Sequence, residues 1–457
     1  MNNQSALIVD LRRKILQSRK LIDIYQWLID SYVLDFYVDN HWDRLPPCWQ
    51  TCFERIKVQE LQALLTDDSD SGKSTVWPLS ILAIRVLLRE LSISRKLRQT
   101  DTGSDSKKQQ TAFCCHKKLF DKSVKLKKRH EIEKFCEECW LTGQTTNVEH
   151  LVDVGSGQGN LARSLNYGYG LQVCCIEQDE QLVNTAKLKD EELSCRLKKQ
   201  FKIESTHHPV HLSRKENLEM IDPCKFVQMI LDSFNIEAST PFRFGLIGLH
   251  PCGDLAVILI KLFLSCPEAT FIKIVCCCYM KLSTKEDKTK SFGFPLSEFS
   301  NKHRLKLSYE AREIACHAVE QYCNKLQTDY DELKVHAFRA AAEKIIVKLH
   351  PQLKHSGLKS TKVTNMSFQQ YCDKALAGLG IELPQAETQS EDTRSNLSNW
   401  QRVVKFYTLR LMFAPLIESV ILYDRWLYLL EQGISSKIEV LFDPVLSPRN
   451  HALTGWK

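Results

Sequence analysis

The chain has 457 residues, of which 43% are hydrophobic and 26% are charged, and its formal net charge is +7 at pH 7. This composition is that of an ordinary globular protein, and the length exceeds one typical core, so two or more substructures are expected. The mildly basic charge is compatible with an anionic partner without demonstrating one.

The 18 cysteines exclude a secreted disulfide scaffold, because such scaffolds are usually short and poor in core residues. Cys174–Cys175 and Cys276–Cys278 lie in apolar, strand-like runs, where cysteines behave as small hydrophobic residues. We therefore expect a reducing, intracellular location, cytoplasmic or nuclear. No apolar segment follows Met1 and no stretch reaches 18 apolar residues, so we expect neither a signal peptide nor a membrane span.

The first part of the chain has a helical pattern. Apolar residues recur at helical spacing through 5–39, and 76–91 is typical of a buried helix. The polar stretch 98–110 resembles a linker between domains. These features predict an N-terminal helical domain over 1–110. A basic run then leads into an amphipathic helix, within a segment that we delimit as 111–146.

From residue 147 the pattern alternates between strands and helices. The run "VEHLVDVG" is followed by the helical "NLARSLN" and the apolar "LQVCCIEQD", which predicts a β-α-β unit with a parallel crossover. Two more buried strands are expected in 244–253 and 271–280, with a helix between them. This alternation favours a doubly wound α/β sheet. The third strand, between 200 and 235, is ambiguous.

Residues 281–400 interrupt this alternation with lysine-rich, polar and weakly helical sequence, and we expect 384–399 to be a mobile loop. A helix over 412–433 and a strand hairpin near the end resume the pattern. After the lead-in segment we therefore predict three parts. Residues 147–280 form the first part of the core, residues 281–400 form a partly flexible insertion on the substrate side, and residues 401–457 form the second part of the core.

The stretch "VDVGSGQGNLAR" (152–163) indicates a cofactor site. Three glycines let the backbone turn sharply and approach a ligand, and the helix that begins near Asn160 offers free N–H groups to it. The dinucleotide pattern G-x-G-x-x-G would require glycine at position 160. The observed G-x-G-x-G, with Asp153 two residues before the first glycine, is instead the pattern of S-adenosylmethionine-dependent class I methyltransferases.

Glu177 ends the next strand, 24 residues after Asp153, where a carboxylate can accept hydrogen bonds from both ribose hydroxyls. The same carboxylate would suit NAD, so Glu177 indicates adenosine-type cofactors in general. The predicted cofactor is S-adenosyl-L-methionine. The residues expected to bind it are Asp153, Gly155, Ser156, Gly157, Gly159 and Glu177.

The acceptor side is expected at the ends of the fourth and fifth strands, because ligands of open α/β sheets lie outside the carboxyl ends of the strands. "LHPCGDL" (249–255) and "CCCY" (276–279) occupy these ends. His250 and Asp254 are candidate bases for an oxygen or nitrogen acceptor, and Tyr279 is expected to line the pocket. His250 could equally be a strand-end histidine bonded only to backbone.

A metal site is not expected. Zinc bound by His250, Cys252 and one thiol of Cys276–Cys278 is chemically possible, but the regular C-x-x-C pairing is absent. Cys136-x-x-Cys139 has ligand spacing without a second such pair. The basic run 122–130 could meet phosphates or act as a nuclear address, although such runs are usually solvated helix starts.

Several motifs together resemble the methyltransferase-like 25 family, including its branch called ribosomal RNA adenine dimethylase domain-containing protein. They span residues 42–450 in a distinctive order: "WDRLP", "WPLS", "KKRHEI", "DVGSGQG", "LHPCGDL", "CCCY", "GFPLS" and "FDPVLSPRN". The pair "LHPCG" and "CCCY" is also similar to elements of the tRNA acceptor-stem 2′-O-methyltransferases. The resemblance implies an α/β, Rossmann-like class I methyltransferase sheet with an N-terminal helical domain and a long insertion before the last helix and β-hairpin.

The expected function is methyl transfer from S-adenosylmethionine, with RNA the favoured acceptor and protein the second. Enzymes that methylate adenine N6 place an Asn/Asp-Pro-Pro-aromatic motif after the fourth strand, where this chain has His250-Pro251-Cys252-Gly253. We therefore do not expect this chain to dimethylate adenine, although the name of that branch of the family suggests this activity. The alternative of a different class is a catalytically inactive scaffold, with or without bound cofactor, that acts through its helical N-terminal domain. We expect no membrane partner, and the sequence does not fix the oligomeric state.

Overall fold

A computed structural model describes residues 3–66, 75–97, 119–120, 124–202, 207–215, 218–285, 293–359 and 361–457. The chain forms two compact units, each built from segments that are distant in the sequence. The sheet unit contains Met1–Ile15, Ser94–Lys306 and Val420–Lys457, and the helical unit contains Leu16–Ile93 and Leu307–Ser419. The predicted linker 98–110 and Lys122 of the basic run lie outside the described residues.

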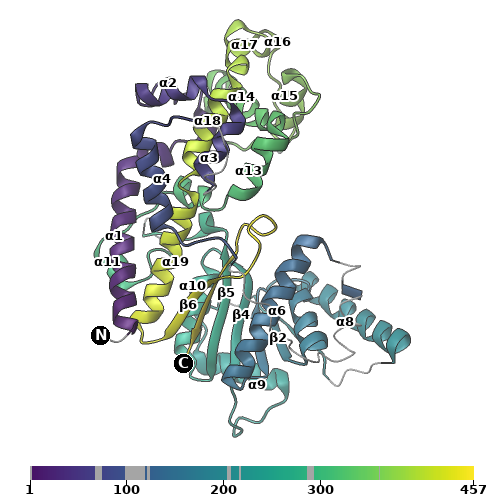
Figure 1. Ribbon diagram of the computed structural model, residues 1–457. Coiled ribbons are helices and arrows are strands. Elements are labelled where there is room, and N and C mark those ends of the chain that lie inside the picture. The colour runs from purple at the N-terminus through teal and green to yellow at the C-terminus, as the bar shows by residue number, and fades with distance from the viewer. Residues whose placement is uncertain are drawn as a thin grey trace. The chain divides into compact units, whose positions relative to one another are not determined.

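The sheet unit is organised around seven strands in the order β3-β2-β1-β4-β5-β7-β6 (Figure 1). The first five strands are parallel to their neighbours, and β7 runs antiparallel to both β5 and β6. The strands are β1 His150–Val154, β2 Gln172–Glu177, β3 Val210–Ser213, β4 Phe244–Cys252, β5 Ala269–Cys277, β6 Ser435–Val440 and β7 His451–Trp456. The doubly wound sheet and the terminal hairpin are confirmed.

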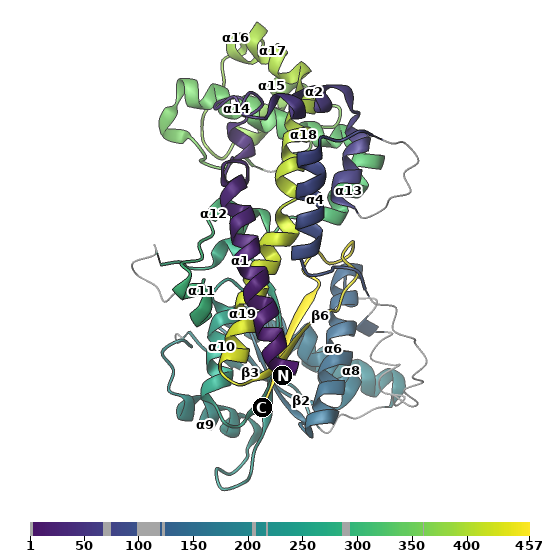
Figure 2. The ribbon, with the colours of Figure 1, turned by 60° about the vertical axis from the view of Figure 1, so that its left-hand side comes forward.

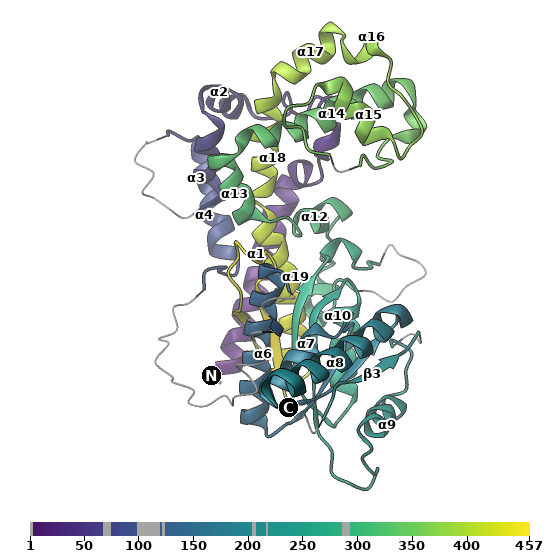
Figure 3. The same cartoon turned by 90° about the vertical axis from the view of Figure 1, so that its right-hand side faces the viewer.

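Helices cover both faces of this sheet, so its strands are near-continuous apolar runs. Figure 3 shows α6, α7 and α8 in front of the sheet, and α10 packs on β4 and β5. Alternate strand residues such as Leu151 and Val173 share an apolar core with Phe135 and Cys139 of α6, so the thiol of Cys139 packs among hydrophobic side chains. The helices are α6 Leu126–Thr146, α7 Asn160–Arg163, α8 Glu180–Phe201, α9 Pro223–Phe234, α10 Leu255–Ser265 and α11 Glu298–Lys302.

The helical unit is built mainly on α14, which packs against α17, α18 and the short turn Val33–Asp35 (Figure 2). Its helices are α2 Pro47–Arg55, α3 Gln62–Leu65, α4 Leu79–Leu91, α12 Tyr309–Ile314, α13 Val319–Thr328, α14 Lys334–Leu349, α15 Phe368–Leu376, α16 Gln385–Thr388, α17 Glu391–Ser398 and α18 Trp400–Leu411. Helices α1 (Asn3–Ile29) and α19 (Ala414–Glu431) each contribute residues to both units.

This division corrects the predicted domain boundaries. The segments predicted as an N-terminal domain (1–110) and as an insertion (281–400) contribute to one common unit. Arg410 donates a hydrogen bond to the carbonyl of Ile29 (2.8 Å), and the hydroxyl of Tyr37 donates to the carbonyl of Asn396. The helices before residue 93 bury their apolar faces against helices after residue 307, and periodicity along the chain does not reveal such a distant partner.

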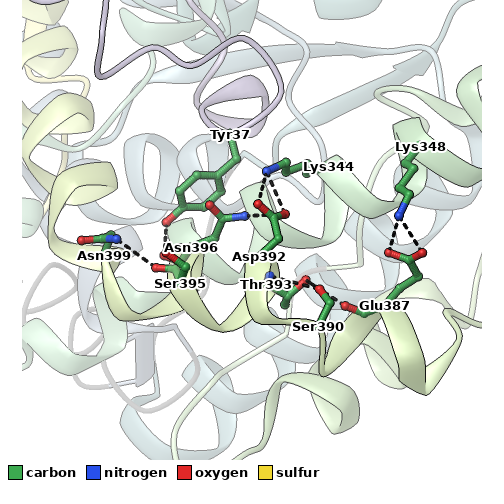
Figure 4. Close-up of polar contacts among 10 residues, drawn as sticks. All are labelled: Tyr37, Lys344, Lys348, Glu387, Ser390, Asp392, Thr393, Ser395, Asn396 and Asn399. Atoms are coloured by element: carbon green, nitrogen blue, oxygen red, sulfur yellow. Dashed lines mark hydrogen bonds and ion pairs between the residues drawn. The ribbon is translucent and has the colours of Figure 1, made fainter.

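The prediction of a mobile loop over 384–399 is wrong, because this stretch forms α16 and α17 (Figure 4). Ser390 caps α17 by accepting a hydrogen bond from the backbone N–H of Thr393. Lys344 pairs with Asp392 at 2.8 Å, and Lys348 of the same helix pairs with Glu387 at 2.7 Å. The polar composition that suggested a loop therefore supplies caps and ion pairs.

Among the residues that the structure describes, one helical stretch, Trp400–Glu431, is long and apolar enough to cross a membrane, although 94% of its most apolar window is buried within the protein. Such burial is what the core helix of a folded domain shows. Charged residues such as Glu418 and Asp424 divide this helical stretch, so it contains no run of 18 consecutive apolar residues.

We predict that the buried Lys273 on β5 stabilises the sheet unit strongly. Its ammonium group is paired with Glu439 at 3.1 Å and with Glu138 at 3.2 Å. Burial works to lower the pKa of Lys273, but the carboxylates of Glu439 and Glu138 outweigh it and raise that pKa. Lys273→Met should destabilise the protein by about 3 kcal/mol, because Glu138 loses the ammonium group that lies 3.2 Å away and Glu439 keeps only its pair with Lys437 near the surface.

Lys437→Met is the matched control, since Lys437 pairs with the same Glu439 but is about half exposed. It should cost at most about 1 kcal/mol. Urea unfolding of both variants measures the difference. Equal midpoints for the two variants would show that the buried position adds nothing.

Candidate functional site

The glycine turn between β1 and α7 is free of side chains where a ligand would approach. Gly155, Gly157 and Gly159 all have positive φ, at 75°, 57° and 69°. A Cβ at Gly157 would meet nothing within 4 Å, whereas one at Gly159 would lie 2.7 Å from the ring of His211. Gly157 therefore leaves open space in which a ligand can approach the backbone, whereas Gly159 allows close packing against His211.

Glu177 at the end of β2 holds this turn in place. Its carboxylate accepts backbone N–H bonds from Gly157 at 2.9 Å, Gln178 at 2.8 Å and Asp179 at 3.1 Å. A carboxylate has about four lone-pair sites, so three N–H donors leave capacity for a further donor such as a ribose hydroxyl. The predicted role of Glu177 fits this geometry, and the carboxylate additionally fixes the turn that the cofactor would contact.

Asp153 is buried at the end of β1 beside the turn. Burial, and secondarily the negative charge of Glu177, raises the pKa of its carboxyl group to about 7. A cationic group placed next to Asp153 would favour the ionised form. The buried hydroxyl of Ser156 lies beside the thiol of Cys175 and has no other hydrogen-bond partner within the described part of the chain. Both observations fit a site that binds a polar, positively charged ligand.

A buried ion-pair network supports the turn from the side of α8. Arg163 pairs with Asp190 at 2.7 Å and donates a hydrogen bond to the carbonyl of Gln158 at 2.6 Å. His211 of β3 contacts the other oxygen of Asp190 at 2.8 Å. Because Arg163 donates to the carbonyl of Gln158, which is part of the glycine turn, the network holds the turn in place. The sequence did not predict this network.

His250 of β4 is paired with Glu131, which α6 contributes from about 120 positions earlier in the chain. The Nε2 atom of His250 lies 3.3 Å from Glu131, and His250 has a positive φ of 71°. Glu131 also accepts a hydrogen bond from the hydroxyl of Ser447 at 2.6 Å. Burial alone would raise the pKa of Glu131, but the bonds from His250 and Ser447 lower it. The histidine is therefore oriented by a carboxylate and is not bonded only to backbone.

The structure favours the other two predicted acceptor-side residues less. Asp254 accepts a hydrogen bond from the backbone N–H of Ser283 at 2.8 Å and so anchors the segment after β5. Tyr279 is 1% exposed, its hydroxyl lies 3.3 Å from the carbonyl of Cys276, and its ring lies beneath Arg425 and Arg449. These contacts describe anchoring and packing roles, and His250 is the better candidate base.

Three thiols meet beside this site at the ends of β4 and β5. The Sγ atom of Cys252 lies 3.3 Å from those of both Cys277 and Cys278. Hydrogen bonds shared with Cys277 and Cys278, against the effect of burial, lower the pKa of Cys252 to about 5, whereas the pKa values of Cys277 and Cys278 rise. The prediction of a buried run holds for Cys276 and Cys277, but Cys278 is only partly buried and Cys252 is exposed.

The site lies where the strand order reverses. Strands β1 and β4 are neighbours at the centre of the sheet, with β2 on one side and β5 on the other. In open α/β sheets the crevice at such a reversal, beyond the carboxyl ends of the strands, is where ligands bind. The glycine turn follows β1, Glu177 ends β2, and His250 and the thiols lie at the ends of β4 and β5. The cofactor residues and the candidate base therefore share one edge.

Comparison with known proteins identifies a domain of the same class. Residues 127–285 match a family model described as a methyltransferase domain. The probable methyltransferase-like protein 25 of Homo sapiens is 32% identical over 231 residues, covering 46% of this chain and 36% of that protein. The Mus musculus protein of the same name is 30% identical over 228 residues, covering 46% and 37%. The chain thus spans little more than a third of these relatives.

Two solved structures have weak similarity to the chain. The plantazolicin methyltransferase in complex with SAH has a TM-score of 0.21 at 12% identity, covering 47% of this chain and 70% of that chain. Coclaurine N-methyltransferase, bound to N-methylheliamine and SAH, has a TM-score of 0.22 at 10% identity, covering 90% and 95%. Residues 127–285 form a methyltransferase domain, and the sheet that they begin has the predicted Rossmann-like fold.

We predict that Glu177→Ala weakens the binding of S-adenosylhomocysteine by about tenfold or more, the loss expected for charge-assisted hydrogen bonds. Calorimetric titration measures the affinity. Glu180→Ala is the matched control, because Glu180 is exposed at the start of α8 and should leave the affinity unchanged. An equal affinity for both variants would remove Glu177 from the cofactor site.

Asp153 predicts a pH dependence of the same binding. Its carboxyl group has a pKa of about 7, so raising the pH through neutrality creates the carboxylate that attracts the ammonium group of S-adenosylhomocysteine. The affinity of the wild type relative to Asp153→Asn should rise between about pH 6 and pH 7.5, by at most about tenfold per pH unit. A ratio that stays constant over this range would contradict a role for Asp153.

Proposed function

We propose that this protein transfers a methyl group from S-adenosylmethionine to an oxygen or nitrogen atom of RNA. The observation that carries the proposal is the pairing of His250 with Glu131 on the edge that also holds the glycine turn and Glu177. The proposed methyl donor and the candidate base would thus lie together where the strand order of the sheet reverses.

The cofactor would lie along the turn from Asp153 to Gly159, and when bound it supplies an electrophilic methyl group on a sulfonium. Glu177 would accept a hydrogen bond from its ribose, and Asp153 would face its positively charged methionine end. The open space at Gly157 gives the backbone a close approach to it. Holding the acceptor in line with the methyl group accounts for most of the catalysis, since positioning removes the entropic cost of the encounter.

His250 would accept the proton that the acceptor atom loses. If its Nε2–H points to Glu131, its Nδ1 keeps a lone pair for that proton. The negative charge of Glu131 then stabilises the imidazolium that forms, and Ser447 fixes the carboxylate. General base catalysis of this kind contributes about 10²–10⁴-fold to a rate.

The charges around this pair favour an anionic acceptor such as RNA. Lys125, Lys127 and Lys128 are exposed at the start of α6, the helix that brings Glu131 to His250. Partial burial of its ammonium group, and then the positive charges of Lys189 and Arg163, lowers the pKa of Lys128, so Lys128 and Lys189 lie close together even though Arg163 is paired with Asp190. Phosphate groups bind to such clusters, and neutral protein segments gain less from them. The similarity of "LHPCG" and "CCCY" to tRNA 2′-O-methyltransferase elements supports the same class of acceptor.

The proposal does not extend to dimethylation of adenine. The end of β4 carries His250-Pro251-Cys252-Gly253 in place of the Asn/Asp-Pro-Pro-aromatic motif. The carbonyl and side chain that grip an exocyclic amino group are therefore replaced by a histidine and a thiol. An intracellular location follows from the same proposal, because RNA is methylated in the cytoplasm or nucleus.

We predict the outcome of a labelling experiment in which the purified protein is incubated with tritiated S-adenosylmethionine and an extract of cells that lack this protein. RNase should remove the tritium label from the extract, and protease should not. His250→Ala should lower this labelling by about 10²–10⁴-fold. Glu131→Gln should lower kcat with little change in the affinity for S-adenosylhomocysteine, because Glu131 acts through His250. Lys134→Ala, which lies on the solvent side of the same helix, is the control.

Three results would contradict parts of the proposal. Labelling that protease removes would identify a protein methyltransferase with the same cofactor site. Binding of S-adenosylhomocysteine without label in any fraction would identify a scaffold that has kept the cofactor turn but not the reaction. A wild-type rate in His250→Ala would exclude the histidine as the base.

A further inference from the structure

The thiols of Cys252, Cys277 and Cys278 form a cluster that the proposed methyl transfer does not use. Cys252 and Cys277 face each other in the register of the parallel strands β4 and β5. Cys278 follows directly, and its left-handed backbone, with φ of 49°, turns its side chain to the same point. All three sulfur atoms lie within 4.8 Å of one another.

Packing as small hydrophobic residues does not explain this cluster. Cys174 and Cys175 are a fair comparison, because they are adjacent thiols on a strand and both are buried in apolar surroundings. In the cluster, by contrast, Cys252 is exposed and Cys278 is only partly buried. An apolar contact does not require thiols to gather at the solvent-facing end of a sheet.

The backbone around the cluster is bent in a way that brings the thiols together. The register between β4 and β5 shifts between Leu249 and Cys252. His250 and Cys278, which are not glycines, both have positive φ, a backbone conformation that residues other than glycine rarely adopt. Strain of this kind persists where the surrounding structure and a function require it.

The spacing of the sulfur atoms suits a single metal ion. Zinc binds thiolates at about 2.3 Å in a tetrahedral site, which places two sulfur ligands roughly 3.8 Å apart. The observed 3.3 Å separations of Cys252 from Cys277 and Cys278 need only a small expansion to reach this value. An iron–sulfur cluster would hold its cysteines much farther apart, because the cluster itself lies between them.

We propose that Cys252, Cys277 and Cys278 bind one thiophilic metal ion, zinc in the first place, as a three-thiolate site with an open fourth position. Three protein ligands and one exchangeable position are the arrangement of catalytic zinc sites. The exposure of Cys252 leaves that position accessible to water or to a group of the acceptor. The spacing of these cysteines along the chain does not predict the site, because the ligands come from the ends of two neighbouring strands.

The test uses the full chain purified under reducing conditions. Metal analysis should find about one zinc ion per chain, and replacement by Co²⁺ should give the intense thiolate-to-cobalt absorption of a sulfur-rich tetrahedral site. Cys252→Ser is the main variant, because this exposed residue tolerates serine without loss of the fold. It should weaken zinc binding by more than the 10–100-fold that loss of an outer-shell partner costs. Cys278→Ser should do the same.

Cys195→Ser is the matched control, because Cys195 is also exposed but lies on α8, outside the cluster. It should keep the metal. Mass spectrometry of alkylated protein adds an independent measurement: zinc should protect the three cluster thiols and leave Cys195 reactive.

Three results would overturn the proposal: no zinc or cobalt bound while the three thiols are reduced, unchanged zinc affinity in Cys252→Ser and Cys278→Ser, or a Cys252–Cys277 disulfide in freshly purified protein. None of these measurements depends on methyl transfer, so the metal site and the proposed function fail or stand separately.

Discussion

The hydrogen bond from the backbone N–H of Gly157 to the carboxylate of Glu177 is the contact on which the site depends. It ties the turn after β1 to the end of β2, and so converts a flexible run of glycines into a fixed cradle. The same carboxylate accepts the N–H groups of Gln178 and Asp179, which fixes the start of the connection to α8. One buried charge therefore shapes both sides of the region where a cofactor would lie.

The parallel sheet does the rest of the positioning. Because β1, β2, β4 and β5 run in the same direction, their carboxyl ends meet at one edge, and every candidate group lies there. The acceptor side needs one more element, since β4 supplies His250 but not its partner. Helix α6 provides Glu131, and the loop before β7 provides Ser447. Three segments that are far apart in the chain thus build the candidate base.

Sequence patterns predicted the parts of the protein in which neighbours along the chain interact. The glycine turn, Glu177 and the terminal hairpin are local features, and all three were identified from residue order alone. Features that depend on distant contacts were missed. The pairing of Glu131 with His250, and the joining of 16–93 with 307–419, require knowledge of which surfaces meet. The sequence did not predict a metal site at the three thiols. Spacing rules describe ligands on one segment, whereas Cys252 and Cys277 come from neighbouring strands.

The central claim is that the turn between β1 and α7, held by Glu177, binds S-adenosylmethionine. A crystal of the protein soaked with S-adenosylhomocysteine tests this claim most directly. The account predicts continuous density for the ligand along Gly155–Gly159, with its ribose hydroxyls against the carboxylate of Glu177. Density elsewhere, or an empty turn at saturating ligand, would contradict the account and leave only the fold.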